Sequence, residues 1–120
     1  MVMRRTRADV GGPTITELAD LLNTTVRALR YYEQAQILRP DRDGANTRRY
    51  GPKARDRAEL IVALRGVGVP LSDIKTMTQG GGKLDQDAVT ALLQAQVALA
   101  ETQLSTLHRL LEASREGLFR

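Results

Sequence analysis

The 120-residue chain contains no cysteine and no tryptophan, and it has a single histidine, His108. The missing cysteines exclude disulfides, thiolate metal sites, iron–sulfur clusters and thiol redox sensing. One histidine cannot build a metal site by itself, and we interpret His108 as a helix-surface residue. The sequence therefore predicts no metal and no cofactor.

Long hydrophobic runs are also missing. No apolar stretch reaches the roughly 18 residues that a membrane-spanning helix needs. The first seven residues carry three arginines, but no apolar signal-peptide core follows them. We therefore expect a cytoplasmic protein without a membrane partner.

Positive charge is concentrated in the first half of the chain. Residues 1–57 carry 12 basic and 7 acidic side chains, whereas residues 58–120 carry 6 and 7. All three tyrosines also lie in the basic half. This asymmetry predicts a polyanionic partner for the first half and a protein partner for the second.

Two short amphipathic segments follow a polar stretch, residues 1–12, that we interpret as a flexible basic arm. Thr14 and Glu17 have the spacing of a capping box, which predicts a helix to about Leu22. Asn23 suits the left-handed end of that helix, and Thr25 is a good N-cap for the next. The two helices predict a helix-turn-helix, and the second would be its recognition helix. Its outward face carries Arg27, Ala28 and Tyr31, which suit base edges and phosphates.

The segment after the second helix predicts a small β wing. Residues 41–46 have turn chemistry, and residues 47–50 have strand-compatible ends. Because strand side chains alternate, Arg48 and Arg49 must point to opposite faces. One of them is then available to a phosphate, and the other can brace Tyr50 or the recognition helix.

Two further helices complete the predicted head. Gly51-Pro52 opens a third helix that ends near Gly66 and Gly68, with Ala58, Ile61, Val62 and Leu64 on its apolar face. A short fourth helix begins at Pro70 and ends at the Gly80–Gly82 run. We predict a winged-helix domain over residues 13–79 and a glycine hinge over 80–83.

A long helix over residues 84–118 follows, rich in Ala, Leu, Gln and Glu. Its apolar positions alternate steps of three and four, the heptad spacing of a coiled coil. One helix cannot bury such a row on itself, which predicts a homodimer. The predicted dimerisation residues are Val97, Ala100, Leu104, Leu107, Leu111 and Leu118.

Taken in order, these residues resemble the MerR family of bacterial transcription regulators. The resemblance rests on residues 14–19, on Val26-Arg27-x-Leu29-Arg30-Tyr31-Tyr32-Glu33, on Leu38-x-Pro40-x-Arg42, on Arg48-x-Tyr50 and on residues 64–74. Gln36 departs from the family's usual glycine, at a cost of about 1 kcal/mol if left-handed. Thr47 replaces a frequent tyrosine in the wing.

The resemblance implies a mainly α protein, with a winged helix-turn-helix head and a C-terminal coiled-coil helix. It implies a homodimer that binds double-stranded DNA at a pseudo-palindromic promoter element, bends and untwists it, and so acts indirectly on RNA polymerase. The sequence leaves open the alternative of a simple repressor that binds the promoter without bending or untwisting it. The predicted DNA-binding residues are Thr14, Thr25, Arg27, Ala28, Tyr31, Arg48, Arg49, Tyr50 and Lys53.

An enzyme and a helical protein–protein adaptor are the alternatives to a DNA-binding regulator. An enzyme is disfavoured because the sequence offers no nucleophile–base pair and no phosphate-binding glycine loop, so we predict no catalytic residue. A helical protein–protein adaptor would use the coiled coil but leave the basic head unexplained. A small-molecule effector stays possible, and the sequence does not identify it.

Overall fold

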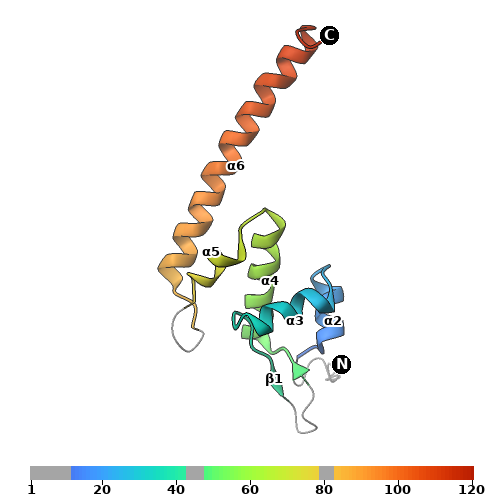
Figure 1. Ribbon diagram of the computed structural model, residues 1–120, viewed down its shortest axis with the longest axis vertical. Coiled ribbons are helices and arrows are strands. Elements are labelled where there is room, and N and C mark those ends of the chain that lie inside the picture. The colour runs from blue at the N-terminus through green and yellow to red at the C-terminus, as the bar shows by residue number, and fades with distance from the viewer. Residues whose placement is uncertain (1–11, 43–47, 79–82) are drawn as a thin grey trace, which may run out of the picture. The chain divides into compact units, whose positions relative to one another are not determined.

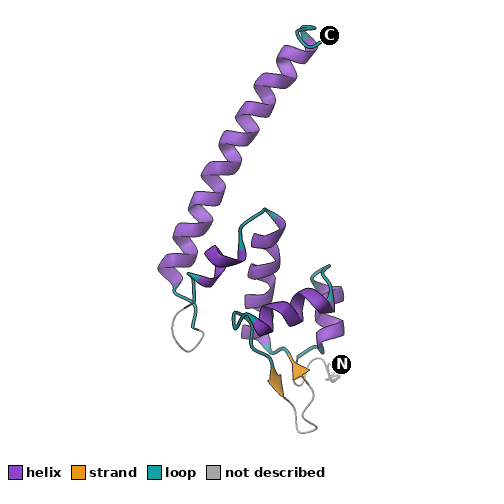
Figure 2. Ribbon diagram, viewed as in Figure 1, coloured by secondary structure: helices purple, strands orange, loops and turns teal. Residues whose placement is uncertain are grey.

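A computed structural model describes residues 12–42, 48–78 and 83–120. The chain divides into two compact units, residues 1–83 and 84–120. The first unit, called the head here, is mainly helical with one small hairpin (Figures 1 and 2). Its elements are α2 (Ile15–Leu21), α3 (Val26–Gln34), β1 (Asp41–Arg42), β2 (Arg48–Arg49), α4 (Pro52–Gly66) and α5 (Leu71–Lys75).

Helix α2 begins with the predicted capping box. The Glu17 amide donates to the Thr14 hydroxyl at 3.3 Å, and the Thr14 amide donates to Glu17 Oε1 at 2.8 Å. Asn23 follows the helix with φ of 54°, which confirms the predicted left-handed position. The short turn then packs α2 against α3 as a helix-turn-helix.

Helix α3 is capped by Thr25, whose hydroxyl accepts the Ala28 amide at 3.0 Å, as predicted. Its inward side buries Leu29 and Tyr32. Two residues after the helix, Gln36 has φ of 64° and therefore bears the strain expected of a left-handed residue, about 1 kcal/mol. The Ile37 amide donates back to the Tyr32 carbonyl and turns the chain toward the core.

The wing is an antiparallel pair in which Asp41 faces Arg49 and Arg42 faces Arg48. The tip, with Thr47, lies outside the described residues, as do the arm and residues 79–82 of the predicted hinge. The Tyr50 amide donates to the Pro13 carbonyl at 2.9 Å and ties the wing to the segment before α2. That approach is so close that a Cβ on Gly12 would lie 1.9 Å from the Tyr50 carbonyl oxygen.

Helix α4 starts with Pro52 in its first turn, as predicted, and buries Ala58, Ile61 and Leu64. Helix α5 ends at Lys75, so the prediction that it continues to the glycine run is wrong. The carbonyls of Asp73 and Lys75 each accept both the amide and the hydroxyl of the threonine three residues later: the Thr76 hydroxyl lies 2.6 Å from Asp73 O, and the Thr78 hydroxyl lies 2.8 Å from Lys75 O. The largest fully buried side chains of the head are Tyr50, Leu18, Leu29, Ile37, Ile61, Ile74, Met77 and Val69.

The second unit is one helix, α6 (Gln86–Arg115), of 30 residues and about 45 Å. Asp85 caps it by accepting the amides of Asp87 and Ala88. Gly117, with φ of 84°, ends it. Leu118 therefore lies beyond the helix, with its amide bonded to the Ala113 carbonyl, and the prediction that it continues the heptad row is wrong.

The predicted apolar row lies on the surface of α6. Val97, Leu104 and Leu107 are each more than half exposed, and Ala100 and Leu111 are exposed as well. Of the side chains of α6, all of which the structure describes, Val89 is the one that is buried. This unit therefore has almost no core of its own.

A pair of glycine substitutions tests the close approach at Gly12. Gly12 and Gly68 both have positive φ, so an alanine at either position meets backbone strain of about 1 kcal/mol. Nothing lies within 4 Å of a Cβ at Gly68, whereas the Tyr50 carbonyl blocks one at Gly12. Urea denaturation should show that Gly12→Ala loses at least about 1 kcal/mol more than Gly68→Ala, because the Pro13–Tyr50 bond must break. Equal losses would show that this bond does not hold the head together.

Candidate nucleic-acid interface

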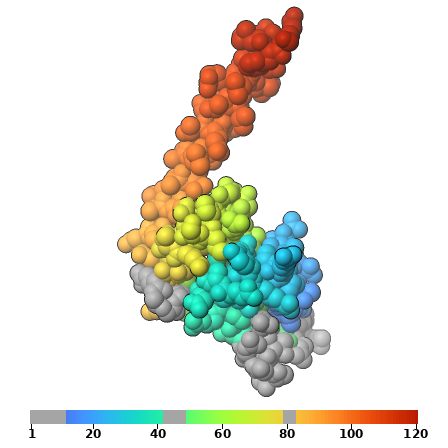
Figure 3. All heavy atoms as spheres, viewed as in Figure 1, coloured from blue at the N-terminus to red at the C-terminus, as the bar shows by residue number. Residues whose placement is uncertain are grey.

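The outward side of α3 is positioned by its own first turn. Because Thr25 fixes where the helix begins, Arg27 and Tyr31 emerge one turn apart on the same face. Arg27 is exposed, Tyr31 is 54% exposed, and Ala28 is half-buried between them. This surface offers a guanidinium, a methyl group and a phenol. In the space-filling view, the atoms of α3 (cyan) adjoin those of α4 and α5 (green to yellow) (Figure 3).

The two predicted threonines have structural tasks in the free protein. The hydroxyl oxygens of Thr14 and Thr25 accept the amides of Glu17 and Ala28 and so cap α2 and α3. Each hydroxyl still has a proton to donate. Both residues lie at helix N-termini, where partial positive charge favours an anion.

Tyr50 supports α3 from inside the head. The side chain is fully buried, and its hydroxyl donates to Glu33 Oε2 at the far end of α3. Tyr50 was predicted to contact DNA, and its fully buried side chain offers no exposed atom for such a contact in the free protein. A phenol without solvent exposure can act on a nucleic acid only through the helix that it holds.

Arg49 is likewise buried, with 4% exposure, and its Nη1 lies 3.9 Å from Glu17 Oε1. The same Glu17 oxygen accepts the Thr14 amide, so one carboxylate joins the start of α2 to β2. Of the two wing arginines, Arg49 is the one that turns inward, and its ion pair is with Glu17 of α2, where Tyr50 or the recognition helix was the predicted partner. The side chain of Arg48 lies outside the described residues.

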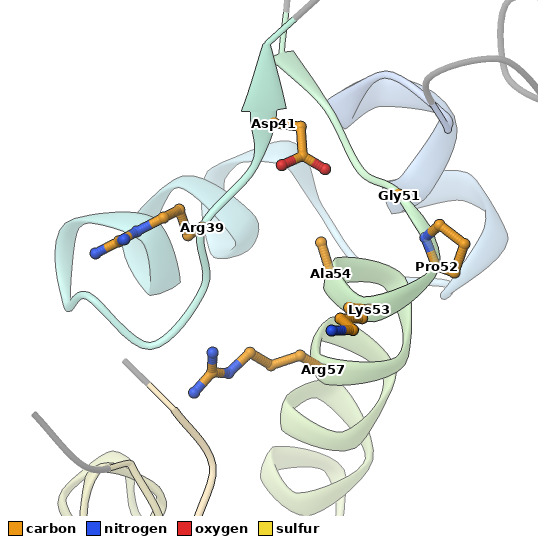
Figure 4. Close-up of a pocket in the computed structure, with 7 residues that line it drawn as sticks. All are labelled: Arg39, Asp41, Gly51, Pro52, Lys53, Ala54 and Arg57. Carbon is orange, nitrogen blue, oxygen red and sulfur yellow. The ribbon is translucent and has the colours of Figure 1, made fainter. Parts of the chain in front are cut away.

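Lys53 is exposed at the start of α4 and lines an open cavity of about 510 Å³. The other lining residues are Arg39, Asp41, Gly51, Pro52, Ala54 and Arg57 (Figure 4). Burial, and then the positive charge of Arg39, lower the pKa of Arg57 from its ordinary value. The structure thus gathers three cationic side chains around one hollow.

Several of these roles were not found from the sequence. The sequence identified Glu17 as a cap but not as the partner of Arg49. It gave Glu33 only as part of the motif, without the bond to Tyr50. Arg39 and Arg57 are absent from the predicted binding residues. One signal was available: Lys53 and Arg57 are four apart and so share a helix face.

The described parts of the head and of α6 hold no group of three or more His, Asp or Glu side chains suited to a metal ion. No helix among those residues is long and apolar enough to cross a membrane.

Comparison with known proteins places this arrangement in a family. BrlR, a transcriptional regulator of Pseudomonas aeruginosa, is 29% identical over 100 residues, which are 82% of this chain and 37% of BrlR. A ZntR homologue of Haemophilus influenzae, an HTH-type transcriptional regulator, is 28% identical over 80% of this chain and 73% of its own length. The chain thus spans little more than a third of BrlR.

A solved structure shares the fold. HiNmlR, a MerR family regulator that lacks the sensor domain and was solved bound to promoter DNA, aligns with a TM-score of 0.68 at 24% identity. The alignment covers 83% of this chain and 78% of HiNmlR. The profile described as MerR HTH family regulatory protein matches residues 14–81, more than half of the sequence. The chain belongs to the MerR family of helix-turn-helix transcription regulators.

Proposed function

We propose that this regulator reads DNA sequence with the outward face of α3, and that it binds a pseudo-palindromic promoter element as a homodimer. The observation that carries the proposal is the support of α3 on both sides. Thr25 fixes its first turn, and the buried Tyr50 holds Glu33 near its last, so Arg27 and Tyr31 project from a rigid helix. Rigid presentation favours base readout, because fewer side-chain and backbone states are lost on binding.

The homodimer is proposed from the exposed row on α6. Val97, Leu104 and Leu107 leave large apolar area in water, and burial of such area stabilises by about 25 cal/mol per Å². A second copy of the helix offers a matching row, as in a two-stranded coiled coil. Two heads at fixed spacing would then contact two half-sites, which gives the element its symmetry.

We further propose that binding bends and untwists the promoter and so changes its use by RNA polymerase. HiNmlR, with the same fold, was solved on promoter DNA, which supports a promoter as the target. Circular-permutation gel shifts on a duplex selected from a random pool test the remodelling. Position-dependent mobility is expected, and uniform mobility would instead indicate a repressor that binds unbent DNA.

Arg27→Ala tests base readout. Loss of a bidentate base contact should weaken binding to the selected duplex by about 1–3 kcal/mol and binding to random duplex much less. Arg109→Ala is the matched control, because it removes the same charge from an exposed position on α6. Fluorescence anisotropy at fixed salt measures both. Equal losses on the selected and random duplexes would make Arg27 a phosphate contact.

The Tyr50→Phe variant tests whether Tyr50 supports α3 from inside the head or contacts DNA directly. The ring stays, but the bond to Glu33 is lost, so urea denaturation should show a loss of about 1 kcal/mol. The slope of log affinity against log salt should stay unchanged, because no phosphate contact disappears. Lys53→Ala removes an exposed cation that is predicted to contact a phosphate. It should therefore leave the free energy of unfolding nearly unchanged and lower the slope of log affinity against log salt by about one. A lowered slope in Tyr50→Phe would restore Tyr50 as a DNA contact.

Leu104→Glu tests the dimer. The variant would place a charge in the apolar row of both copies, and an unpaired buried carboxylate costs several kcal/mol. Sedimentation should show a monomer whose head remains folded, with weakened binding to the selected duplex. Thr102→Glu is the control, since Thr102 is exposed on the opposite side of α6. A Leu104→Glu variant that stays dimeric would place the interface elsewhere.

A further inference from the structure

The hollow beside the start of α4 has the composition of a ligand site. Its wall combines Arg39 of the loop after α3 and Asp41 of β1 with the first turns of α4, which carry Lys53 and Arg57 (Figure 4). Three cations and one carboxylate leave a surplus of two positive charges. Its volume of about 510 Å³ falls in the range of about 300–1,000 Å³ that is typical of small-molecule pockets.

Arg57 lacks a counter-charge among the residues that the structure describes. Its Nε and Nη2 are buried, and neither has a hydrogen-bond partner there. A guanidinium stays charged at any physiological pH, so this desolvation is not relieved by loss of a proton. In Figure 4 the side chains of Arg39 and Arg57 run toward the same side of the hollow, and each raises the electrostatic cost of the other. A bound anion would relieve both costs.

The N-terminus of α4, which forms another part of the wall, also favours an anion. Helix α4 begins at the hollow with Gly51 and Pro52, and neither supplies a side-chain cap. Its first amides and the positive end of its dipole therefore lie beside the three cations. Asp41 is the one acceptor-only side chain of the lining, and it suits a donor on the same ligand, such as a hydroxyl.

At its Arg57 end the hollow fits a small molecule better than a DNA backbone, whereas Lys53 is exposed and can meet either. Backbone phosphates are usually met by exposed side chains, whereas two nitrogens of Arg57, which lines the hollow, are buried. A carboxylate within the site also repels a continuous polyanion. A compact dianion that also carries a hydroxyl would balance the two surplus positive charges and donate a hydrogen bond to Asp41.

We propose that this hollow in the head binds a small phosphate monoester, with the phosphate among Arg39, Lys53 and Arg57 and a hydroxyl donating to Asp41. The site would give the regulator an effector that is sensed inside the DNA-binding head itself. The proposal does not depend on which DNA sequence α3 reads.

The test titrates glycerol 3-phosphate, with glycerol as the neutral comparator, into the full ¹⁵N-labelled chain at constant ionic strength. Saturable amide shifts are expected at Gly51 and over residues 53–57 with the phosphate ester, and none with glycerol. Arg57→Gln should weaken the binding at least tenfold. Arg39→Gln, at an exposed position, should weaken it several-fold and serves if the first variant folds poorly.

Arg55→Gln is the matched control, because Arg55 is exposed on the same helix outside the lining and its loss should change the affinity less than twofold. Equal effects of Arg55→Gln and Arg57→Gln would show general charge attraction and overturn the site. An absence of saturable shifts would also overturn it. If the ester does not bind but Arg57→Gln lowers the salt slope of duplex binding by about one, the hollow contacts DNA and the proposal is wrong.

Discussion

Arg49 and Tyr50, adjacent in sequence where β2 ends, turn into the head and reach two different helices. The Arg49 guanidinium lies beside Glu17 of α2, and the Tyr50 hydroxyl bonds Glu33 of α3. The wing is therefore tied to both helices of the helix-turn-helix at once. The direction of α3, and with it the placement of Arg27, depends on these two contacts made behind the surface.

These two contacts matter more for the orientation of the wing and α3 than for the stability of the head. Arg49 is buried but the Glu17 side chain is about half exposed, and the two lie 3.9 Å apart, so water screens the pair and it adds little net free energy. Removing Glu17 would still be costly, because it would take a carboxylate away from the buried guanidinium of Arg49. Such a pair permits one register of the wing against α2 and penalises the others. The head can thus present α3 and the wing as one body, separately from α6.

Signals that act over three or four residues were read correctly from the sequence. The capping box at Thr14, the left-handed Asn23 and Pro52 at the start of α4 follow from local chemistry, and the structure has all three. Contacts across the fold were not predictable in this way. Strand alternation left open which wing arginine turns inward, and the heptad count ran past Gly117 because it ignored how that residue ends α6. The hollow near Arg57 depends on side chains from two separate segments, which no local pattern reports.

The bond between Pro13 and Tyr50 joins positions 37 residues apart and closes α2, α3 and the wing into one loop. Closing a loop costs entropy that grows with its length, whereas the pairing of α2 with α3 needs only a short turn. The helix pair can therefore form early, and the wing is fixed only when the loop closes. A chain arrested before that step would be helical by circular dichroism and still lack its recognition surface.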